Sequence, residues 1–444
     1  MNQAIQPRIG FRTGAQNVVN LAQPLDTLAF AVLLLTVAVI PTEDPLVIGE
    51  NLGLVKVIAA LGFCLTAIVV IGRRKLSRIN PALVLLACFV TWALISSMWS
   101  VSPEAVVRRT GTYLQLLLFF WMVWELARDH RRVRLLLSAF LVGNLVPLTA
   151  IFYSSLIGLT FWGGRYLMLG ADPNDTALSL AISMTVALYF RATADHRIVR
   201  WLSSVYIPLA LLAVLMTGSR GGLIAALAGL LLYGVTGLLR NGKNAGYLTA
   251  IVLLSVMALP AVLRMMPLDL SARLSDIPAQ LQSGTLSGRR SIWAVGIETF
   301  LDHPICGVGA GNFVFFSSNA LGKDFVEHNA FLAICVEVGI VGATFYFGAL
   351  LWLLRRILRL PAVERQFYLS AFMCWSVGAL SLTWDYRKIS WLLIATAAAH
   401  VRVLGNRRRG SIIPRALRNE RGIPWKPQAA NVAEAVPGVA GTIR

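Results

Sequence analysis

The chain has 444 residues, of which 57% are hydrophobic and only 14% are charged, and its mean hydropathy is +0.69. Soluble domains carry about 25% charged residues, so this composition excludes a soluble globular enzyme. The formal net charge of +19 raises the question of a nucleic-acid partner. The five cysteines do not indicate disulfides, because all but Cys306 lie inside apolar runs.

Apolar stretches of about 20 residues recur along the chain and are separated by charged or turn residues, which predicts an all-α, polytopic membrane protein with about twelve transmembrane helices. The expected spans are 25–40, 52–72, 81–98, 110–126, 134–157, 175–190, 201–217, 221–239, 246–264, 329–353, 367–384 and 389–404.

The basic residues support this topology. Most of the 40 Lys and Arg fall in the connections that share a side with the N-terminus, and the positive-inside rule makes that side cytoplasmic. A basic surface beside anionic lipid explains the net charge without nucleic acid. We therefore expect membrane lipids, and no nucleic acid, as partners, with both termini in the cytoplasm.

The two ends of the chain lie outside the spans. Residues 1–24 form a polar cytoplasmic leader and not a cleavable signal peptide, because many further spans follow. Residues 405–444 are basic and rich in Pro, Gly and Ala, which predicts a disordered cytoplasmic tail. Residues 25–404 are expected to form the membrane domain.

One outer loop, 265–327, is much longer than the other connections, and loops of this length are usually functional. Trp293, Ile297, Phe300 and Leu301 repeat at helical spacing in it, which predicts an amphipathic helix on the outer membrane surface that ends at His303. The glycine run at 307–312 (GVGAGN) predicts an irregular turn. It is not a dinucleotide fingerprint, because Asn312 occupies the place of the third glycine.

Outer arginines are candidate anion ligands. Arg220 lies in the short connection 217–222 (TGSRGG), where it either snorkels to the headgroups or forms an anion site with Ser219 and the N–H groups of the next helix. Arg289 and Arg290 begin the amphipathic helix, and Arg165 lies on another outer connection. These four arginines could converge on one phosphate-bearing ligand.

His328 is the candidate general base. It stands beside Asn329 where a span begins on the outer side, and an ordinary histidine pKa of about 6.5 allows it to accept a proton near neutral pH. The alternative is that His328 only caps this helix. Glu337, further along the same span, needs either a polar partner on another helix or a function.

The outer stretch 172–175 (DPND) begins another span, and capping of that helix is its default role, with Asn174 as a supporting site residue. Its carboxylates could instead hold a divalent cation, but no clustered Cys or His motif adds to them, so we predict no metal. The 218–222 run lacks the Gly-Lys-Ser/Thr of a P-loop, so nothing supports ATP hydrolysis.

An ordered set of motifs resembles the O-antigen ligase and polymerase superfamily. It comprises 97–104 (SMWSVSPE), 217–222 (TGSRGG), 287–289 (SGR) with Trp293, 303–304 (HP) with 307–313 (GVGAGNF), and His328 and Asn329 with Leu332, Glu337 and Gly339.

The resemblance implies a GT-C-like glycosyltransferase of the bacterial inner membrane that needs no metal or other cofactor. Such enzymes move a glycan from an undecaprenyl-pyrophosphate carrier to an acceptor hydroxyl on the periplasmic side, the acceptor being lipid A-core or a growing polysaccharide. On this resemblance Arg220 and Arg289 would hold the pyrophosphate and His328 would be the catalytic residue. Arg165 and Arg290 are supporting ligands with a less secure correspondence.

Three alternatives remain open. An O-antigen or exopolysaccharide polymerase would share the site and differ in acceptor. A secondary transporter, including the bicarbonate type that shares these motifs, fits less well, because its coupling residues should lie near the bilayer midplane in corresponding halves. A non-catalytic scaffold for polysaccharide assembly is the third alternative.

Overall fold

The computed structural model describes residues 13–43, 47–48, 52–74, 76–161, 164–241 and 288–411. Within these ranges the regular elements are helices, together with a two-stranded antiparallel hairpin of two-residue strands. In chain order the elements are α1 (Thr13–Val39), η1 (Ile40–Thr42), β1 (Val47–Ile48), β2 (Leu52–Gly53), α2 (Leu54–Arg73), α3 (Pro81–Ile95), η3 (Ser96–Met98), α4 (Pro103–Leu126), α5 (His130–Gly143), α6 (Leu145–Leu156), α7 (Pro173–Thr193), α8 (Arg197–Met216), α9 (Arg220–Asn241), α13 (Arg289–Asp302), α14 (Phe313–Leu321), α15 (Ala330–Ile357), α16 (Ala362–Ala379) and α17 (Lys388–Ser411).

The all-α, polytopic membrane class is confirmed. Nine helical segments among the described residues are long and apolar enough to cross a bilayer, and each coincides with an expected span. α4 and α16 coincide with the expected spans 110–126 and 367–384 but are more polar, and the expected span 246–264 lies outside the described residues. The expected span 134–157 is divided at Asn144 into α5 and α6.

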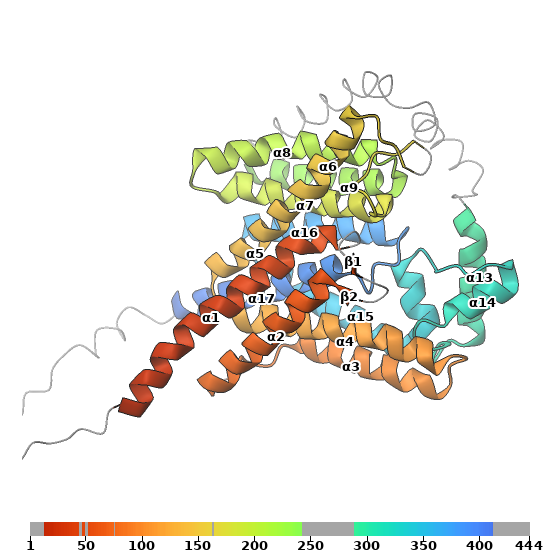
Figure 1. Ribbon diagram of the computed structural model, residues 1–444, viewed down its shortest axis with the longest axis horizontal. Coiled ribbons are helices and arrows are strands. Elements are labelled where there is room, and N and C mark those ends of the chain that lie inside the picture. The colour runs from red at the N-terminus through yellow and green to blue at the C-terminus, as the bar shows by residue number, and fades with distance from the viewer. Residues whose placement is uncertain are drawn as a thin grey trace, which may run out of the picture.

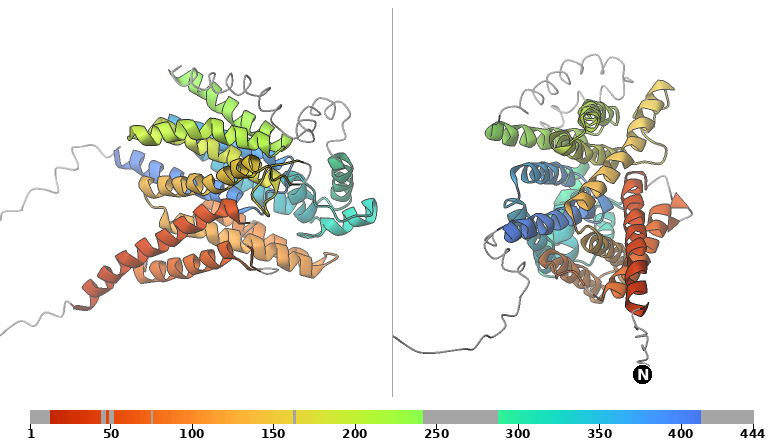
Figure 2. Two further views of the ribbon diagram at one scale, coloured as in Figure 1. Left: turned by 45° about the horizontal axis from the view of Figure 1, so that its top comes forward. Right: turned by 90° about the vertical axis from the view of Figure 1, so that its left-hand side faces the viewer.

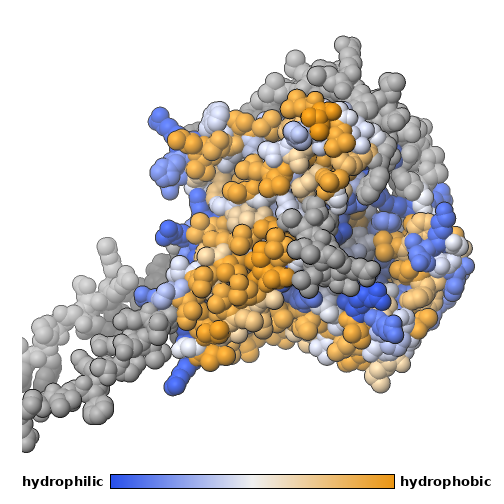
Figure 3. Space-filling model, viewed as in Figure 1, coloured by the Kyte–Doolittle hydropathy of each residue, from blue (hydrophilic) through white to orange (hydrophobic). Residues whose placement is uncertain are grey.

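The helices form a bundle in which α7 and α17 are innermost (Figures 1 and 2). Residues 176–190 of α7 and 389–400 of α17 are buried without interruption. Large apolar side chains elsewhere are exposed, such as Ile71 at 74% and Leu156 at 85%. In Figure 3 an apolar area fills the middle of this face and hydrophilic residues gather towards its two ends, as expected of a protein that spans a bilayer.

Small residues allow the closest helix contacts. Gly222 of α9 faces Ala177 of α7, and an added Cβ would lie 2.4 Å from that side chain. Gly221 faces Ser381, which follows α16, and an added Cβ would lie 2.5 Å from its Oγ. The two glycines after Arg220 therefore let α9 begin between α7 and the end of α16.

α15 is broken at Gly339, whose φ of 64° and ψ of −171° are outside the helical region. The glycine run that follows α13 fills the break. The N–H groups of Val308 and Gly309 donate to the carbonyls of Val336 (3.0 Å) and Glu337 (2.8 Å), and Ile340 N–H donates to Pro304 O (2.8 Å). Trp92 Nε1 donates to Val338 O (2.9 Å). The irregular turn expected from the sequence thus satisfies the backbone of a broken helix.

The helix expected in the outer loop is confirmed as α13, with His303 as its C-cap. Ile292, Gly296 and Thr299 form the buried face of α13, while Ile297 and Leu301 of the expected membrane-facing stripe are 52% and 68% exposed. Gly296 determines which face of α13 is buried. It lets α13 approach Leu332 of α15 so closely that an added Cβ would lie 2.8 Å from Leu332 Cδ2.

Substitution of Gly339 by Ala should lower the free energy of unfolding by about 1–3 kcal/mol, because only glycine readily adopts this backbone conformation. The added Cβ would also lie 2.2 Å from Ile305 O. The measurement is thermal unfolding of the purified protein in detergent. Gly348→Ala in the same helix is the control, since its nearest neighbour is 3.8 Å away. Equal melting temperatures for the two variants would contradict this account of the break.

Candidate functional site

The first part of the site is the junction between α7 and α9. Asp172 caps α7, and its Oδ1 accepts from the N–H groups of Asn174 (2.8 Å) and Asp175 (3.0 Å). Ser219 precedes α9 and its Oγ accepts from Gly222 N–H (3.2 Å) while donating to Asn174 Oδ1 (2.9 Å). This hydrogen bond joins two helix N-termini, so the N-terminal ends of both helix dipoles meet beside Arg220.

The capping role expected for the 172–175 stretch is therefore confirmed for Asp172. Asp175 has a different role, since its Oδ1 accepts from Trp384 Nε1 (2.7 Å) and its Oδ2 is ion-paired with Arg387. These contacts tie the start of α7 to the segment between α16 and α17.

The second part of the site is the start of α13. Gly288 takes a left-handed conformation, with φ of 81°, and Arg289 follows as the first helical residue. Burial is the largest cause of a lowered pKa for Arg289, and the positive charge of Arg220 lowers it further, whereas Asp172 raises it. Two motifs far apart in the sequence thus bring their guanidinium groups within electrostatic range of each other.

The third part is the segment before α15. Asn329 is the cap of this helix, with Oδ1 accepting from Phe331 N–H (3.0 Å) and Leu332 N–H (3.2 Å), so His328 does not cap it. His328 is half-buried and has a φ of 46°, an uncommon value for a residue other than glycine. Trp293 Nε1 of α13 donates to Glu327 O (3.0 Å) and fixes this segment against the helix that carries Arg289.

The charges around His328 favour its neutral form. Its pKa is lowered, first by burial and then by the positive charge of Arg289, and Asp172 opposes this shift. A neutral imidazole can accept a proton, so His328 is suited to act as a base near neutral pH. Arg220, Arg289, His328 and Asp172 therefore form one electrostatic group.

The other expected arginines differ in position. Tyr166 N–H donates to Met216 O (3.1 Å), which places the neighbouring Arg165 beside the connection that carries Arg220. Arg290 is exposed on α13. The expected convergence of the four arginines on one ligand stays a prediction. The charge of Arg220 acts on Arg289, and Arg165 lies beside the connection that carries Arg220.

A buried charge cluster next to this group was missed from the sequence. The Arg109 guanidinium of α4 lies 3.7 Å from Glu337 and 3.9 Å from Asp385, and it stacks 4.1 Å from the centre of the Tyr386 ring. Tyr113 donates a hydrogen bond to Asp385. Glu337 therefore has the partner on another helix that its position required.

Glu327 adds a third carboxyl group to this cluster. Burial raises its pKa well above the usual range, as does the charge of Glu337, whereas Arg109 lowers it. Burial likewise raises the pKa of Asp385, against the opposing effect of Arg109. The only sequence signals for this cluster were an intramembrane glutamate and an arginine at the start of a span, because its members are far apart in the chain.

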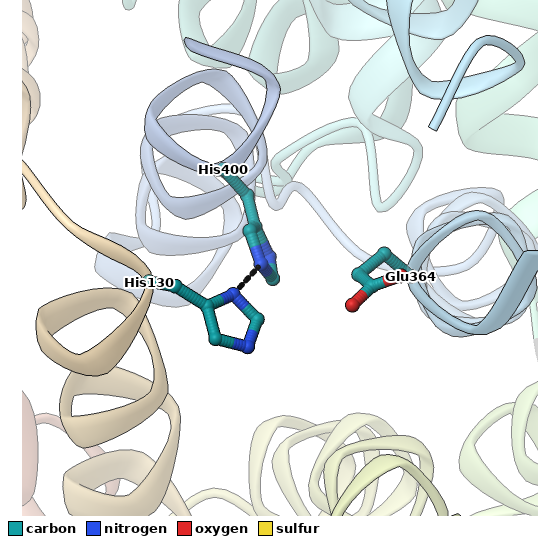
Figure 4. A group of neighbouring side chains, drawn as sticks. All are labelled: His130, Glu364 and His400. Atoms are coloured by element: carbon teal, nitrogen blue, oxygen red, sulfur yellow. Dashed lines mark hydrogen bonds between the residues drawn. The ribbon is translucent and has the colours of Figure 1, made fainter. Parts of the chain in front are cut away.

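One group of side chains could hold a metal ion in the described part of the chain. Ligand atoms of His130, Glu364 and His400 lie within 4.8 Å of one another (Figure 4). His400 Nε2 is 2.8 Å from His130 Nδ1 and its Nδ1 is 3.2 Å from Tyr368 OH, so both ring nitrogens already have hydrogen-bond partners. His130 begins α5, Glu364 lies in the first turn of α16 and His400 lies in α17, away from His328.

Comparison with known proteins agrees with the motifs. Residues 205–347 match the family model described as O-antigen ligase, and this range contains Arg220, Arg289, His328 and Glu337. The match covers about a third of the chain and supports the resemblance of its motifs to the O-antigen ligase superfamily. No curated protein matches the chain. One solved structure, described as "Structural coordination of polymerization and crosslinking by a peptidoglycan synthase complex", is similar at 18% identity and a TM-score of 0.40, covering 75% of this chain and 98% of that chain.

Replacing Asp172 with Asn should lower the pKa of His328 further, because it removes the negative charge that raises this pKa. Asn also caps helices, so the start of α7 is retained. The measurement is the rate of diethyl pyrocarbonate modification of the His328 peptide against pH, read by mass spectrometry. The midpoint should move to lower pH in this variant and stay at the wild-type value in Asp302→Asn, which changes an exposed carboxylate. A midpoint that is unchanged or higher in Asp172→Asn would overturn the electrostatic assignment.

Proposed function

We propose that the chain is a glycosyltransferase of the bacterial inner membrane that moves a glycan from an undecaprenyl-pyrophosphate carrier to an acceptor hydroxyl on the periplasmic side. The observation that carries the proposal is that Arg289 interacts electrostatically with both Arg220 and His328, while the N-termini of α7 and α9 are joined at the connection that carries Arg220. This arrangement combines an anion-binding site with a base, as transfer from a pyrophosphate requires.

Arg220 and Arg289 would bind the pyrophosphate, with Arg165 in support. When the sugar–oxygen bond breaks, negative charge grows on the departing lipid pyrophosphate, and guanidinium groups held in place stabilise that charge without reorganising. The positive charge of Arg220 lowers the pKa of Arg289, whereas Asp172 raises it, so the two arginines repel each other. An anionic ligand would relieve this repulsion.

His328 would accept the proton of the acceptor hydroxyl as its oxygen attacks the anomeric carbon. The new carbon–oxygen bond forms as the bond to the pyrophosphate breaks, so a single displacement inverts the anomeric carbon. The lowered pKa of His328 keeps the imidazole unprotonated and ready for this step. We propose that the reaction is independent of metal, since the arginines supply the positive charge.

We place an O-antigen ligase-like acceptor, lipid A-core, first and a growing O-antigen or exopolysaccharide chain second. Both acceptors present a hydroxyl to the same site, so the distinction requires a product analysis. In this proposal residues 25–404 form the catalytic membrane domain, residues 265–327 form its periplasmic loop, and both termini are cytoplasmic.

The test is a gel profile of lipopolysaccharide and secreted polysaccharide from a deletion strain complemented at matched protein levels. His328→Ala should not restore glycan output, and Arg289→Lys should impair it because lysine keeps the charge but loses the bidentate fork. Arg290→Lys is the matched control and should restore the wild-type profile, since Arg290 is exposed.

The products also separate the alternatives. Lipid A-core without any O-chain, with polymer left on its carrier, indicates a ligase, whereas core bearing a single repeat or loss of secreted polymer alone indicates a polymerase. Full restoration by His328→Ala would remove the assignment of the base. A deletion that changes no glycan would favour a transporter.

A further inference from the structure

A pocket of about 880 Å³ lies at the end of the bundle opposite the candidate site. α15 begins beside His328 and ends at this pocket, whose walls also include the start of α3 and the ends of α4 and α17. By the distribution of Lys and Arg along the chain, this is the cytoplasmic end.

The pocket is strongly basic. Arg78, Arg356, Arg359 and Arg402 line it, and no Asp or Glu is among the described residues that do so. Glu125 is a carboxylate whose charge acts on Arg402. It already accepts hydrogen bonds from Ser77 N–H (3.1 Å) and Ser77 Oγ (2.9 Å). None of the ion pairs between described residues includes these four arginines. Four like charges in one pocket favour an anionic occupant.

A buried donor in the wall points to the same kind of ligand. Asn80 is fully buried, and its Oδ1 accepts from Ala82 N–H (2.9 Å) at the start of α3. Its Nδ2 has no hydrogen-bond partner in the described structure, although Asn80 lines the pocket. A buried amide group without an acceptor is rare in native proteins, and a phosphate oxygen in the pocket would supply one.

The remaining wall is apolar and aromatic. Trp124 lies under the Arg402 guanidinium at 4.0 Å, and Trp352 lies 5.5 Å from that of Arg356. Leu360 and Val401 also face the pocket. A ligand that fills this space therefore needs an anionic part and an apolar part.

We propose that this pocket binds the phosphate-bearing headgroup of an anionic phospholipid of the cytoplasmic leaflet. The arginines and Asn80 Nδ2 hold the phosphate, and the apolar wall contacts the acyl chains next to it. This second lipid site lies far from His328 and does not depend on the proposed glycan transfer.

Native mass spectrometry of the full-length protein in detergent tests the proposal with phosphatidylglycerol as probe. Arg356→Gln combined with Arg359→Gln should weaken its binding by about tenfold or more, since each surface arginine contributes about a factor of five. The matched control combines Arg355→Gln with Arg365→Gln, two exposed arginines that do not line the pocket, and should bind as the wild type does.

Asn80→Asp is a second variant that separates folding from binding. Aspartate keeps the oxygen that caps α3, so the melting temperature should stay near that of the wild type while phosphatidylglycerol binding weakens. Inorganic phosphate at the same concentration should not displace the lipid. Equal binding of phosphatidylcholine, displacement by free phosphate, or unchanged affinity in both pocket variants would overturn the assignment.

Discussion

The break in α15 at Gly339 is the constraint on which the geometry of the outer end depends. A helix broken within a membrane protein leaves backbone groups that water cannot reach, so protein groups must bond to them. The segment 304–309 supplies those bonds, with Gly309 N–H donating to Glu337 O at 2.8 Å. Only glycine fits at Gly307, because an added Cβ would lie 2.5 Å from Gly339 N. The outer loop is thereby anchored to the core, and α13 lies where Arg289 can approach Arg220.

The same break places polar side chains that could not otherwise be buried. Glu337 lies just before Gly339 and faces Arg109, which also approaches Asp385. Three carboxyl groups around one guanidinium cannot all be ionised without a large cost, which agrees with the raised pKa of Glu327 and of Asp385. The cluster connects α4, α15 and the segment before α17, and Glu327 is adjacent in sequence to His328. The cluster therefore supports the segment that carries His328, the candidate base.

The sequence alone predicted the class of fold and the individual motifs, because the hydropathy of a span and the glycines of a turn are local signals. It predicted α13 but not the buried face of that helix, since Gly296 determines the approach to Leu332 and carries no hydropathy. It identified Arg220, Arg289 and His328 as candidate site residues, whereas the exposure of Arg290 is seen only in the fold. Asp385 and Arg109 were not recognised as partners, because nothing local links residues so far apart in the chain. The role of Asn329 as the cap became clear only from its hydrogen bonds.

The central claim is that Arg220 and Arg289 together hold the pyrophosphate of a lipid-linked glycan beside His328. The most direct measurement is an electron cryomicroscopy structure of the full-length protein with undecaprenyl pyrophosphate in a lipid nanodisc. The account predicts density for the two phosphates in contact with both guanidinium groups, within reach of the His328 imidazole. Ordered pyrophosphate bound away from Arg220 and Arg289 would contradict it.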